Sequence, residues 1–288
     1  MTGEARLTRA IADAVTALFV PGDRPERFAK AVASEAHLIV IDVEDAVAPE
    51  DKAAARQNIA EFLNSAEDRP RNVLVRMNAL DSVEAPHDVA LLHRLREQDS
   101  SGLAGVMIAK AESAESVRGL VAQVDASHEV AIVPLIETAQ GIANCGAIAE
   151  VSGVTRLAFG AVDFALDIGA EDAHGSLDSA RSALVLTSRL ATIAAPLDAP
   201  SLEIRDVTAV QNAARRARAF GFGGKLCIHP AQLAAVARAF SPTVAEVEWA
   251  LSIIGHGESA GQVDGQMVDR PVIARAARIL ASRRAATS

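Results

Sequence analysis

Short apolar runs recur along the chain, and each ends in polar or turn-forming residues that lead into a segment with helical patterning. The eight runs occupy residues 17–20, 37–42, 72–78, 105–110, 130–137, 156–163, 191–199 and 225–230. Apolar side chains are nearly continuous within each run, which is typical of parallel strands that are covered on both faces. The runs therefore predict the strands of a parallel sheet.

The segments between the runs carry apolar residues at the spacing of one helix face. Two such stripes are Val117, Leu120, Val121 and Val124, and Val207, Val210, Ala214 and Ala217. Eight strand-then-helix units in sequence predict a closed (β/α)8 barrel, with an open doubly wound sheet as the second choice.

The eighth unit ends near residue 240, so residues 241–288 are not needed to close the barrel. This C-terminal extension contains a helix candidate at 244–254, a glycine-rich stretch at 255–265 and a basic helix at 272–284. We expect a barrel domain of residues 1–240 and an extension that docks on its own barrel or on a neighbouring one.

Composition narrows the class of protein. Half of the 288 residues are hydrophobic, which excludes a disordered chain, and the net charge of −9 disfavours a nucleic-acid partner. Cys145 and Cys227 are too few for a disulfide framework or a zinc site, and we expect both to be buried, inert thiols. The first twenty residues carry Glu4 and Asp13 and no cleavable apolar core, so we expect a cytoplasmic protein without a membrane segment.

Polar residues follow most of the predicted strands. In (β/α)8 barrels the active site forms at the carboxyl ends of the strands, so these residues are the first candidates for function. They are Asp42, Glu44 and Asp45 after the second strand, Arg76 and Asn78 on the third, Lys110 and Glu112 at the fourth, Glu137 after the fifth, Asp163 at the end of the sixth and His229 after the eighth.

Glu137 and Asp163 each follow an apolar strand, where an unpaired carboxylate is costly to desolvate. A divalent cation would remove that cost, and Mg²⁺ suits two carboxylates because water and substrate oxygens complete its octahedral shell. The alternative is that both residues only cap the helices that follow. The pattern by itself leaves the two interpretations equally weighted.

Arg76 is a candidate clamp for a substrate carboxylate, because a guanidinium binds that group with two parallel hydrogen bonds and keeps its proton. The equally weighted alternative is a salt bridge to Asp42, Glu44 or Asp45 at the neighbouring strand end. Both interpretations are compatible with each other.

Three further positions have a functional and a structural interpretation. The loop at 21–27, PGDRPER, with Lys30 one turn later, would suit a polyphosphate, but an ordinary solvated helix start is the favoured interpretation. Lys110 would form a Schiff base only with a lowered pKa, and Glu112 and the acidic surroundings favour its ammonium form instead. His229, before Pro230, could act as a base, but a structural group at a helix start is the favoured interpretation.

Taken together, these motifs resemble the citrate lyase β-subunit-like family of the HpcH/HpaI aldolase/citrate lyase superfamily. The matching stretches are LFVPGDRPERFAKA, IVIDVEDAVAPEDKAAAR, VLVRMNA, MIAKAES, PLIETAQGIANC, LAFGAVDFALDIG, GFGGKLCIHPAQ and GQMVDRP. They run in family order from Leu18 to Pro271 and so cover nearly the whole chain.

The resemblance implies a (β/α)8 barrel, usually a trimer, that cleaves or forms a carbon–carbon bond in acyl-coenzyme A substrates with Mg²⁺. It assigns the metal to Glu137 and Asp163, and the substrate to Arg76 with Glu137. The acidic residue of the family's C-terminal motif falls on Asp269, which becomes a proton-transfer candidate over a neighbouring barrel; from the residues alone Asp269 would be a helix cap.

The resemblance also assigns supporting residues. Asp42, Glu44 and Asp45 fall on the family's acidic motif and would orient the waters on the metal. The coenzyme A region falls on Arg24, Arg27 and Lys30. Many members have an arginine just before the first strand, where this chain has Val15 and Thr16, and a proline where it has Ala109. For this reason citryl-CoA is not assigned as the substrate.

The expected function is thus a Mg²⁺-dependent carbon–carbon lyase that splits a β-hydroxyacyl-CoA into a 2-oxo acid and an acyl-CoA. One alternative is a metal-dependent aldolase that acts on free 2-oxo acids without coenzyme A. Another is a non-catalytic subunit of a lyase complex. The expected partners are a small acyl-CoA or organic acid and further copies of the chain, as a homo-oligomer with a trimer favoured.

Overall fold

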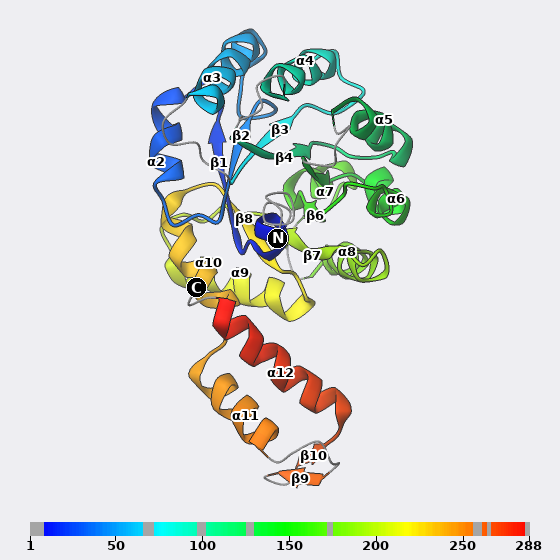
Figure 1. Cartoon of the computed structure of the whole chain (residues 1–288). Coiled ribbons are helices and arrows are strands. Elements are labelled where there is room, and N and C mark those ends of the chain that lie inside the picture. Colours follow the sequence, from blue (N-terminus) through cyan, green and yellow to red (C-terminus); the bar gives the residue numbers. More distant parts are fainter. Residues whose placement is uncertain are drawn as a thin grey trace. The chain divides into compact units, whose positions relative to one another are not determined.

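The computed structural model describes residues 9–65, 72–96, 102–124, 130–171, 175–255, 261–263 and 266–285. Within them, eight parallel strands close into a barrel in chain order (Figure 1), which confirms the predicted (β/α)8 fold. The strands are β1 (Thr16–Pro21), β2 (Leu38–Asp42), β3 (Val73–Met77), β4 (Leu103–Ile108), β5 (Ala131–Ile136), β6 (Arg156–Phe159), β7 (Ala194–Asp198) and β8 (Gly224–Cys227). The pairing of β1 with β8 completes the closure.

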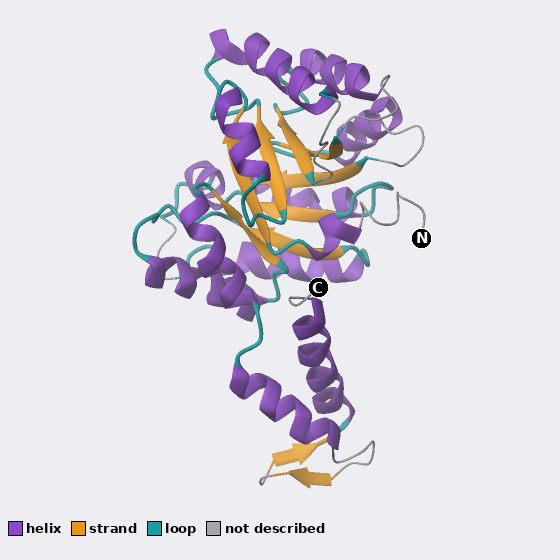
Figure 2. Ribbon diagram, turned by 60° about the vertical axis from the view of Figure 1, so that its left-hand side comes forward, coloured by secondary structure: helices purple, strands orange, loops and turns teal. Residues whose placement is uncertain are grey.

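Helices surround the strands (Figure 2). They are α2 (Phe28–Val32), α3 (Lys52–Asn64), α4 (Ala85–Arg96), α5 (Ala114–Val124), α6 (Ala139–Ala149), α7 (Ala161–Asp167), α8 (Asp178–Leu190), α9 (Val207–Phe220) and α10 (Leu233–Phe240). Short 3₁₀ turns at Pro25–Arg27, Pro49–Asp51 and Pro230–Gln232 precede α2, α3 and α10. Each turn begins with a proline. Proline suits this position because the backbone N–H that it lacks would find no hydrogen-bond acceptor within the helix.

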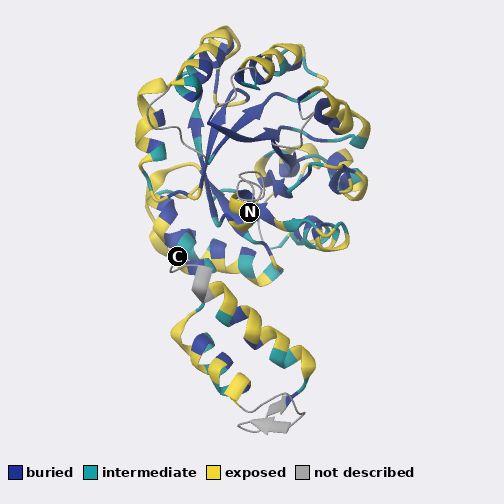
Figure 3. Cartoon of the chain, viewed as in Figure 1, coloured by how far each residue is buried: buried dark blue, intermediate teal, exposed yellow. Residues whose placement is uncertain are grey.

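The predicted helix stripes form the inner faces of these helices, and their outer faces are exposed (Figure 3). In α5 all four predicted residues are buried. In α9 the prediction holds for Val210, Ala214 and Ala217, but Val207 is 46% exposed because it is the first residue of the helix. Each buried valine or leucine stabilises the fold by about 1.5–3 kcal/mol at most.

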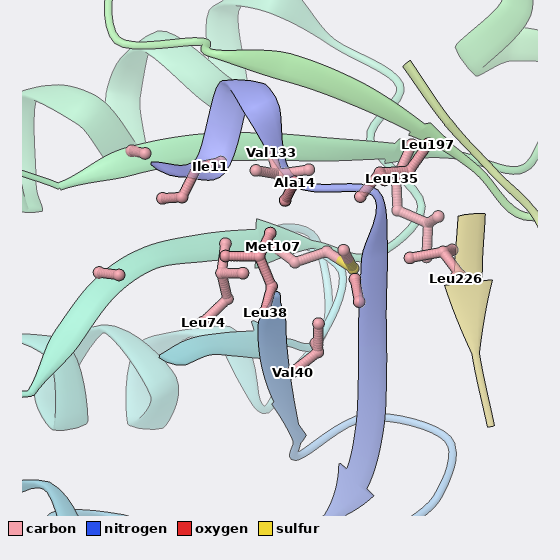
Figure 4. Packing of buried hydrophobic residues seen from close by; sticks show 14 residues of the cluster. Ile11, Ala14, Leu38, Val40, Leu74, Met107, Val133, Leu135, Leu197 and Leu226 are labelled. Atoms are coloured by element: carbon pink, nitrogen blue, oxygen red, sulfur yellow. The ribbon is translucent and has the colours of Figure 1, made fainter. Parts of the chain in front are cut away.

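The interior of the barrel is a layered apolar core made by alternate residues of the strands (Figure 4). Its members include Leu38 and Val40 of β2, Leu74 of β3, Val133 and Leu135 of β5, Leu197 of β7 and Leu226 of β8. Side chains alternate between the two faces of a strand, so the residues in between point outward and pack under the helices. This alternation decides which residues reach the mouth of the barrel.

A buried arginine closes the opposite end of the barrel. Arg156, at the start of β6, is 0% exposed and lies against the N-terminal segment that precedes β1. Its Nη1 donates to the carbonyls of Ile11 (2.9 Å) and Ala14 (2.7 Å), and its Nε and Nη2 donate to the carbonyl of Ala195 (3.1 and 2.6 Å). One guanidinium therefore joins three parts of the chain.

The structure divides into two compact units, Met1–Val236 and Ala237–Ser288. The second unit contains α11 (Val244–Gly255), α12 (Arg270–Ala285) and a short antiparallel pair, β9 (Gly261–Val263) and β10 (Gln266–Val268), where the sequence indicated only a glycine-rich stretch. It has an apolar core of its own, which includes Ala250, Ile253, Ala276 and Ile279. No helix in the described parts of the chain is long and apolar enough to cross a membrane.

Candidate active site

Three strands continue beyond the apolar core toward the barrel mouth. On each of them, the next side chain that points into the barrel is charged. The last interior apolar residue and the charged residue two positions later are Val40 and Asp42, Leu74 and Arg76, and Leu135 and Glu137. Asp42 and Arg76 are direct neighbours in the register of β2 and β3. All three charged residues are buried, with exposed fractions of 1%, 9% and 1%.

Arg76 is held on several sides. Its Nε and Nη2 donate to the two carboxylate oxygens of Asp42 at 2.7 and 2.6 Å, and its Nη1 lies 3.1 Å from Glu44 Oε2. Its guanidinium also stacks over the ring of Phe19, 4.8 Å from the centroid. Burial alone would lower the pKa of Arg76, but the bonds and charge of Asp42 outweigh it and raise the pKa. The salt bridge that the sequence offered as one interpretation of Arg76 is therefore present, with Asp42 and Glu44 as partners.

The carboxylates of the acidic loop after β2 accept hydrogen bonds from backbone N–H groups of the same loop. These hydrogen bonds hold the loop in place. Asp42 accepts the N–H groups of Glu44 (2.9 Å) and Ala46 (3.0 Å), and Glu44 Oε2 accepts the N–H of Asp45 (2.9 Å). Burial raises the pKa of Glu44, and the charge of Arg76 partly offsets that rise. The loop therefore presents Glu44 in one orientation, toward Arg76.

Lys52 and Asn78 support this loop from beneath; Asn78 was a candidate from the sequence, and Lys52 was not. The Lys52 ammonium, 8% exposed, donates to the carbonyls of Val43 (2.7 Å) and Glu44 (3.0 Å) and to Asn78 Oδ1 (2.8 Å). The amide of Asn78 in turn donates to the Val43 carbonyl and to Asp88. The sequence carried no local signal for this role of Lys52.

Glu137 is a desolvated carboxylate at the centre of the mouth. Its Oε1 accepts the backbone N–H of Lys110 at 2.8 Å. Burial, together with repulsion from the nearby Asp163, raises the pKa of Glu137 to about 8 despite that hydrogen bond. Within the described residues, no donor reaches its other oxygen, Oε2.

Asp163 reaches the site from a different element than expected. The sixth strand ends at Phe159, and Asp163 lies in the first turn of α7, not on a strand end. The predicted strand was too long because Gly160 and Ala161 continue the apolar pattern after the backbone has turned into the helix. Asp163 is partly exposed and close enough to Glu137 for their charges to repel.

Gly160 makes room for Glu137. A Cβ at position 160 would overlap Glu137 Oε2 and would lie 2.5 Å from Glu137 Cβ, closer than such atoms approach. We expect Gly160→Ala to fold but to displace the Glu137 carboxylate, which lowers Mg²⁺ affinity by about 10–100-fold, the range for groups that orient a ligand. Calorimetric Mg²⁺ titration checks this, with Gly146→Ala, where a Cβ meets nothing within 4 Å, as the control. Equal affinities would contradict it.

The donors at the mouth fit a hard divalent cation. Among the described residues, no group of three or more His, Cys, Asp and Glu is placed to hold a metal. The pair Glu137 and Asp163 offers oxygen ligands only, with Glu137 Oε2 left over and a mutual repulsion that a cation would relieve. Mg²⁺ is commonly held by one or two carboxylates, with water and substrate supplying the rest.

Lys110 is an ion-pair partner in this site. Its ammonium pairs with Glu44 Oε1 at 2.5 Å and with Asp45 Oδ2 at 3.5 Å, two of the acids that the sequence placed around it together with Glu112. Burial alone would lower the pKa of Lys110, but Glu44 outweighs it and raises the pKa. A raised pKa opposes a Schiff-base role, as expected.

The basic residues of the first loop lie on the surface. Arg24 and Arg27 are 56% and 60% exposed at their side chains and, within the described residues, form ion pairs with their sequence neighbours Asp23 (3.6 Å) and Glu26 (3.8 Å). Lys30 on α2 is exposed as well. The three cations are therefore accessible from solvent.

The remaining candidates take structural roles here. His229 Nδ1 accepts the N–H of Ala231 at 3.1 Å and begins a 3₁₀ turn. Cys145 and Cys227 are free and buried, and burial raises the pKa of Cys227 to about 12. Asp269 lies in the C-terminal unit, where its Oδ1 accepts the N–H of Val272 (3.1 Å) and caps α12.

Comparison with known proteins places the chain in a family. The model of the HpcH/HpaI aldolase/citrate lyase family matches residues 16–230. A citrate lyase subunit beta-like protein of Deinococcus radiodurans is 35% identical over 91% of this chain and 95% of its own length. An L-malyl-CoA/beta-methylmalyl-CoA lyase of Cereibacter sphaeroides is 32% identical over 88% of this chain and 89% of its own.

A solved structure is similar over nearly its whole length. The crystal structure of the CitE protein of Mycobacterium tuberculosis in complex with magnesium, acetoacetate and coenzyme A superposes with a TM-score of 0.81. The two sequences are 32% identical, and the match covers 94% of this chain and 98% of that one. The chain therefore belongs to the HpcH/HpaI aldolase/citrate lyase family and is a lyase, as its named relatives are.

Proposed function

We propose that this lyase cleaves a β-hydroxyacyl-CoA thioester to a 2-oxo acid and an acyl-CoA, and that it requires Mg²⁺. The observation that carries the proposal is the pair of nearby carboxylates, Glu137 and Asp163, beside the fixed guanidinium of Arg76. The Mycobacterium tuberculosis relative, which binds magnesium and coenzyme A in its crystal structure, supports both requirements.

Arg76 would hold the carboxylate of the 2-oxo acid portion. A guanidinium has five N–H donors. Asp42 takes two of them and Glu44 faces a third, so one on each Nη nitrogen stays available. Because Asp42, Glu44 and Phe19 fix the orientation of Arg76, it is pre-organised to receive a substrate.

Glu137 and Asp163 would hold the cation. Bound there, Mg²⁺ would supply Lewis acidity toward the hydroxyl and carboxylate oxygens of the substrate. Asp42, Glu44 and Asp45 would orient the waters of this site through the loop that they stiffen.

The bond changes define what the protein must do. The hydroxyl oxygen would give its proton to the Asp269 carboxylate and form the carbonyl of the 2-oxo acid, the bond to the adjacent carbon would break, and its electron pair would stay on the thioester as an enolate. A proton must then reach the enolate carbon. We assign that proton to the carboxyl group of Asp269, contributed in cis or by an adjoining copy of the chain.

The surface cations of the first loop, Arg24, Arg27 and Lys30, would receive the phosphates of coenzyme A. The extension from residue 241 onward would dock on its own or a neighbouring barrel in a homo-oligomer, for which we favour a trimer. Light scattering of the purified chain checks the oligomeric state.

The function is tested with the full-length chain, Mg²⁺ and a panel of thioesters that includes malyl-CoA, citramalyl-CoA and citryl-CoA. We expect release of a 2-oxo acid from at least one of them, complete loss of turnover in excess EDTA, and recovery when Mg²⁺ is restored. Resistance to EDTA with trapping by borohydride would indicate a Schiff base instead.

The same preparation separates the two alternatives. Cleavage of free hydroxy-oxo acids without binding of acetyl-CoA at millimolar concentration would indicate the metal-dependent aldolase. Mg²⁺ binding without turnover of any free thioester would indicate a non-catalytic subunit of a lyase complex.

A further inference from the structure

The barrel mouth holds more acidic groups than one divalent cation needs. The carboxylates are Asp42, Glu44, Asp45, Glu137 and Asp163. Two fixed cations neutralise part of this charge: Arg76 binds both oxygens of Asp42, and Lys110 pairs with Glu44 and Asp45. The carboxylates without a side-chain cation bound to them are Glu137 and Asp163, as far as the described residues show.

Lys110 has an unusual geometry for this role. Its backbone adopts φ 47°, a left-handed conformation that costs a non-glycine residue energy and that occurs at functional sites. In this conformation its N–H points at Glu137 Oε1 (2.8 Å) while its ammonium reaches Glu44. One residue thus contacts both the carboxylate proposed for the metal and the acidic loop.

We propose that Lys110 is a positioning residue that occupies the carboxylates of Glu44 and Asp45, and thereby prevents them from capturing the divalent cation that Glu137 and Asp163 hold. This inference rests on the proposed metal site. It assigns to Lys110 a selective role that neither a Schiff base nor a simple surface ion pair would have.

The carboxylates of Glu44 and Glu137 are ligands of the same kind and could compete for one cation. Lys110 contacts Glu44 through its ammonium and Glu137 through its backbone N–H, and the charges of Glu44 and Glu137 are close enough to repel each other. If the ammonium were absent, Glu44 would remain in place because Arg76 and the loop hold it. Its freed oxygen would then be an additional ligand for Mg²⁺.

Loss of the Lys110 charge should therefore raise the affinity for Mg²⁺ and lower kcat. Removing one positive charge within several ångströms of a divalent ion, even in a water-like dielectric, strengthens its binding by about tenfold. Capture by Glu44 displaces the ion from the substrate geometry, and such misplacement lowers kcat by about 10–100-fold. A residue that merely stabilised the fold would not raise the affinity.

The test is calorimetric titration of the full-length chain with MgCl₂ in the absence of substrate. We expect Lys110→Met and Lys110→Gln to bind Mg²⁺ about tenfold more tightly than the parent chain. Lys110→Arg, which keeps the charge, should bind as the parent does. Lys225→Met is the control, because Lys225 is also ion-paired but its partner is Asp198, whose neighbour Leu197 is the residue of β7 that points into the barrel interior.

A second step identifies the captured ligand. Glu44→Gln should weaken Mg²⁺ binding much more in the Lys110→Met background than in the parent chain, because Glu44 is a ligand only in the former. Equal weakening in both backgrounds, or unchanged or weaker affinity in both Lys110→Met and Lys110→Gln, overturns the proposal. The proposed lyase activity fails separately, if the parent chain binds Mg²⁺ but cleaves no thioester.

Discussion

Glu137→Gln is expected to lower kcat by more than about 10³-fold, since a metal that acts as a Lewis acid contributes several kcal/mol to transition-state stabilisation. The amide has nearly the size of the carboxylate but offers no charge to a divalent cation. Mg²⁺ affinity should fall with the activity. Asp163→Ala should have the same two effects, measured by steady-state kinetics and by titration with MgCl₂.

The fold should survive the Glu137→Gln change and gain stability in metal-free buffer. Burial and Asp163 raise the pKa of Glu137 to about 8 from an ordinary 4.5, so the folded protein binds this proton more tightly than the unfolded chain. The carboxylate therefore costs stability increasingly as the pH rises from about 4.5 to 8, and the amide removes that cost. We expect a higher Tm than that of the parent chain at pH 8 and a smaller difference at pH 5.

Glu150→Gln is the matched control, because it makes the same chemical change at an exposed position after α6. It should change neither turnover nor Tm. If Glu137→Gln kept full activity after removal and restoration of Mg²⁺, the proposed metal site would be wrong.

Arg156→Met is expected to lower the free energy of unfolding by about 3–5 kcal/mol, the cost of removing one partner from a buried polar network. Methionine fills most of the volume, but the carbonyls of Ile11, Ala14 and Ala195 lose their charged donor. These carbonyls lie on the N-terminal segment and on β7, so the change loosens the end of the barrel opposite the mouth. Urea denaturation measures the difference.

Arg156→Lys should fall between the parent and the methionine variant, because an ammonium keeps the charge but cannot reach the three carbonyls with the planar geometry of a guanidinium. Arg118→Met, at an exposed position on α5, should leave stability unchanged. A loss below about 1 kcal/mol in Arg156→Met would show that the network contributes little beyond a typical hydrogen bond.

The predictions for Glu137 and Arg156 concern opposite ends of the barrel. The interior core between them is apolar, and both ends carry charged groups: Arg76 binds Asp42 of the neighbouring strand at the mouth, and Arg156 binds carbonyls of the N-terminal segment and of β7 at the other end. Function is expected from Glu137 at the mouth, and stability from Arg156 at the other end. This separation agrees with the general division of labour between the two ends of (β/α)8 barrels.

Much of this arrangement could be predicted from the sequence because it depends on local periodicity. The apolar runs identified all eight strands, and their carboxyl ends indicated where Asp42, Arg76 and Glu137 gather. The end of the sixth strand was wrong, because apolar composition does not mark where a backbone turns into a helix. Asp163 was assigned to a strand end for that reason, although it lies on α7.

The contacts that give each charged residue its environment depend on side chains that are distant in sequence. The sequence offered Glu112 and the acids of the mouth in general as partners of Lys110, and the closed sheet selects Glu44, 66 positions away. It gave no sign that Lys52 would hold two loop carbonyls or that Arg156 would bind Ile11 and Ala195. No short-range pattern encodes such pairs.

The order of strands and helices, the apolar interior and the set of acids and cations at the strand ends follow from the sequence, because side-chain alternation and helix spacing are properties of neighbouring residues. The tertiary structure alone decided which carboxylate each cation neutralises, and so which ones stay available to a metal. That choice is made by closure of the barrel, which brings the ends of β2, β3, β4 and β5 around one mouth and sets the distances between their charges.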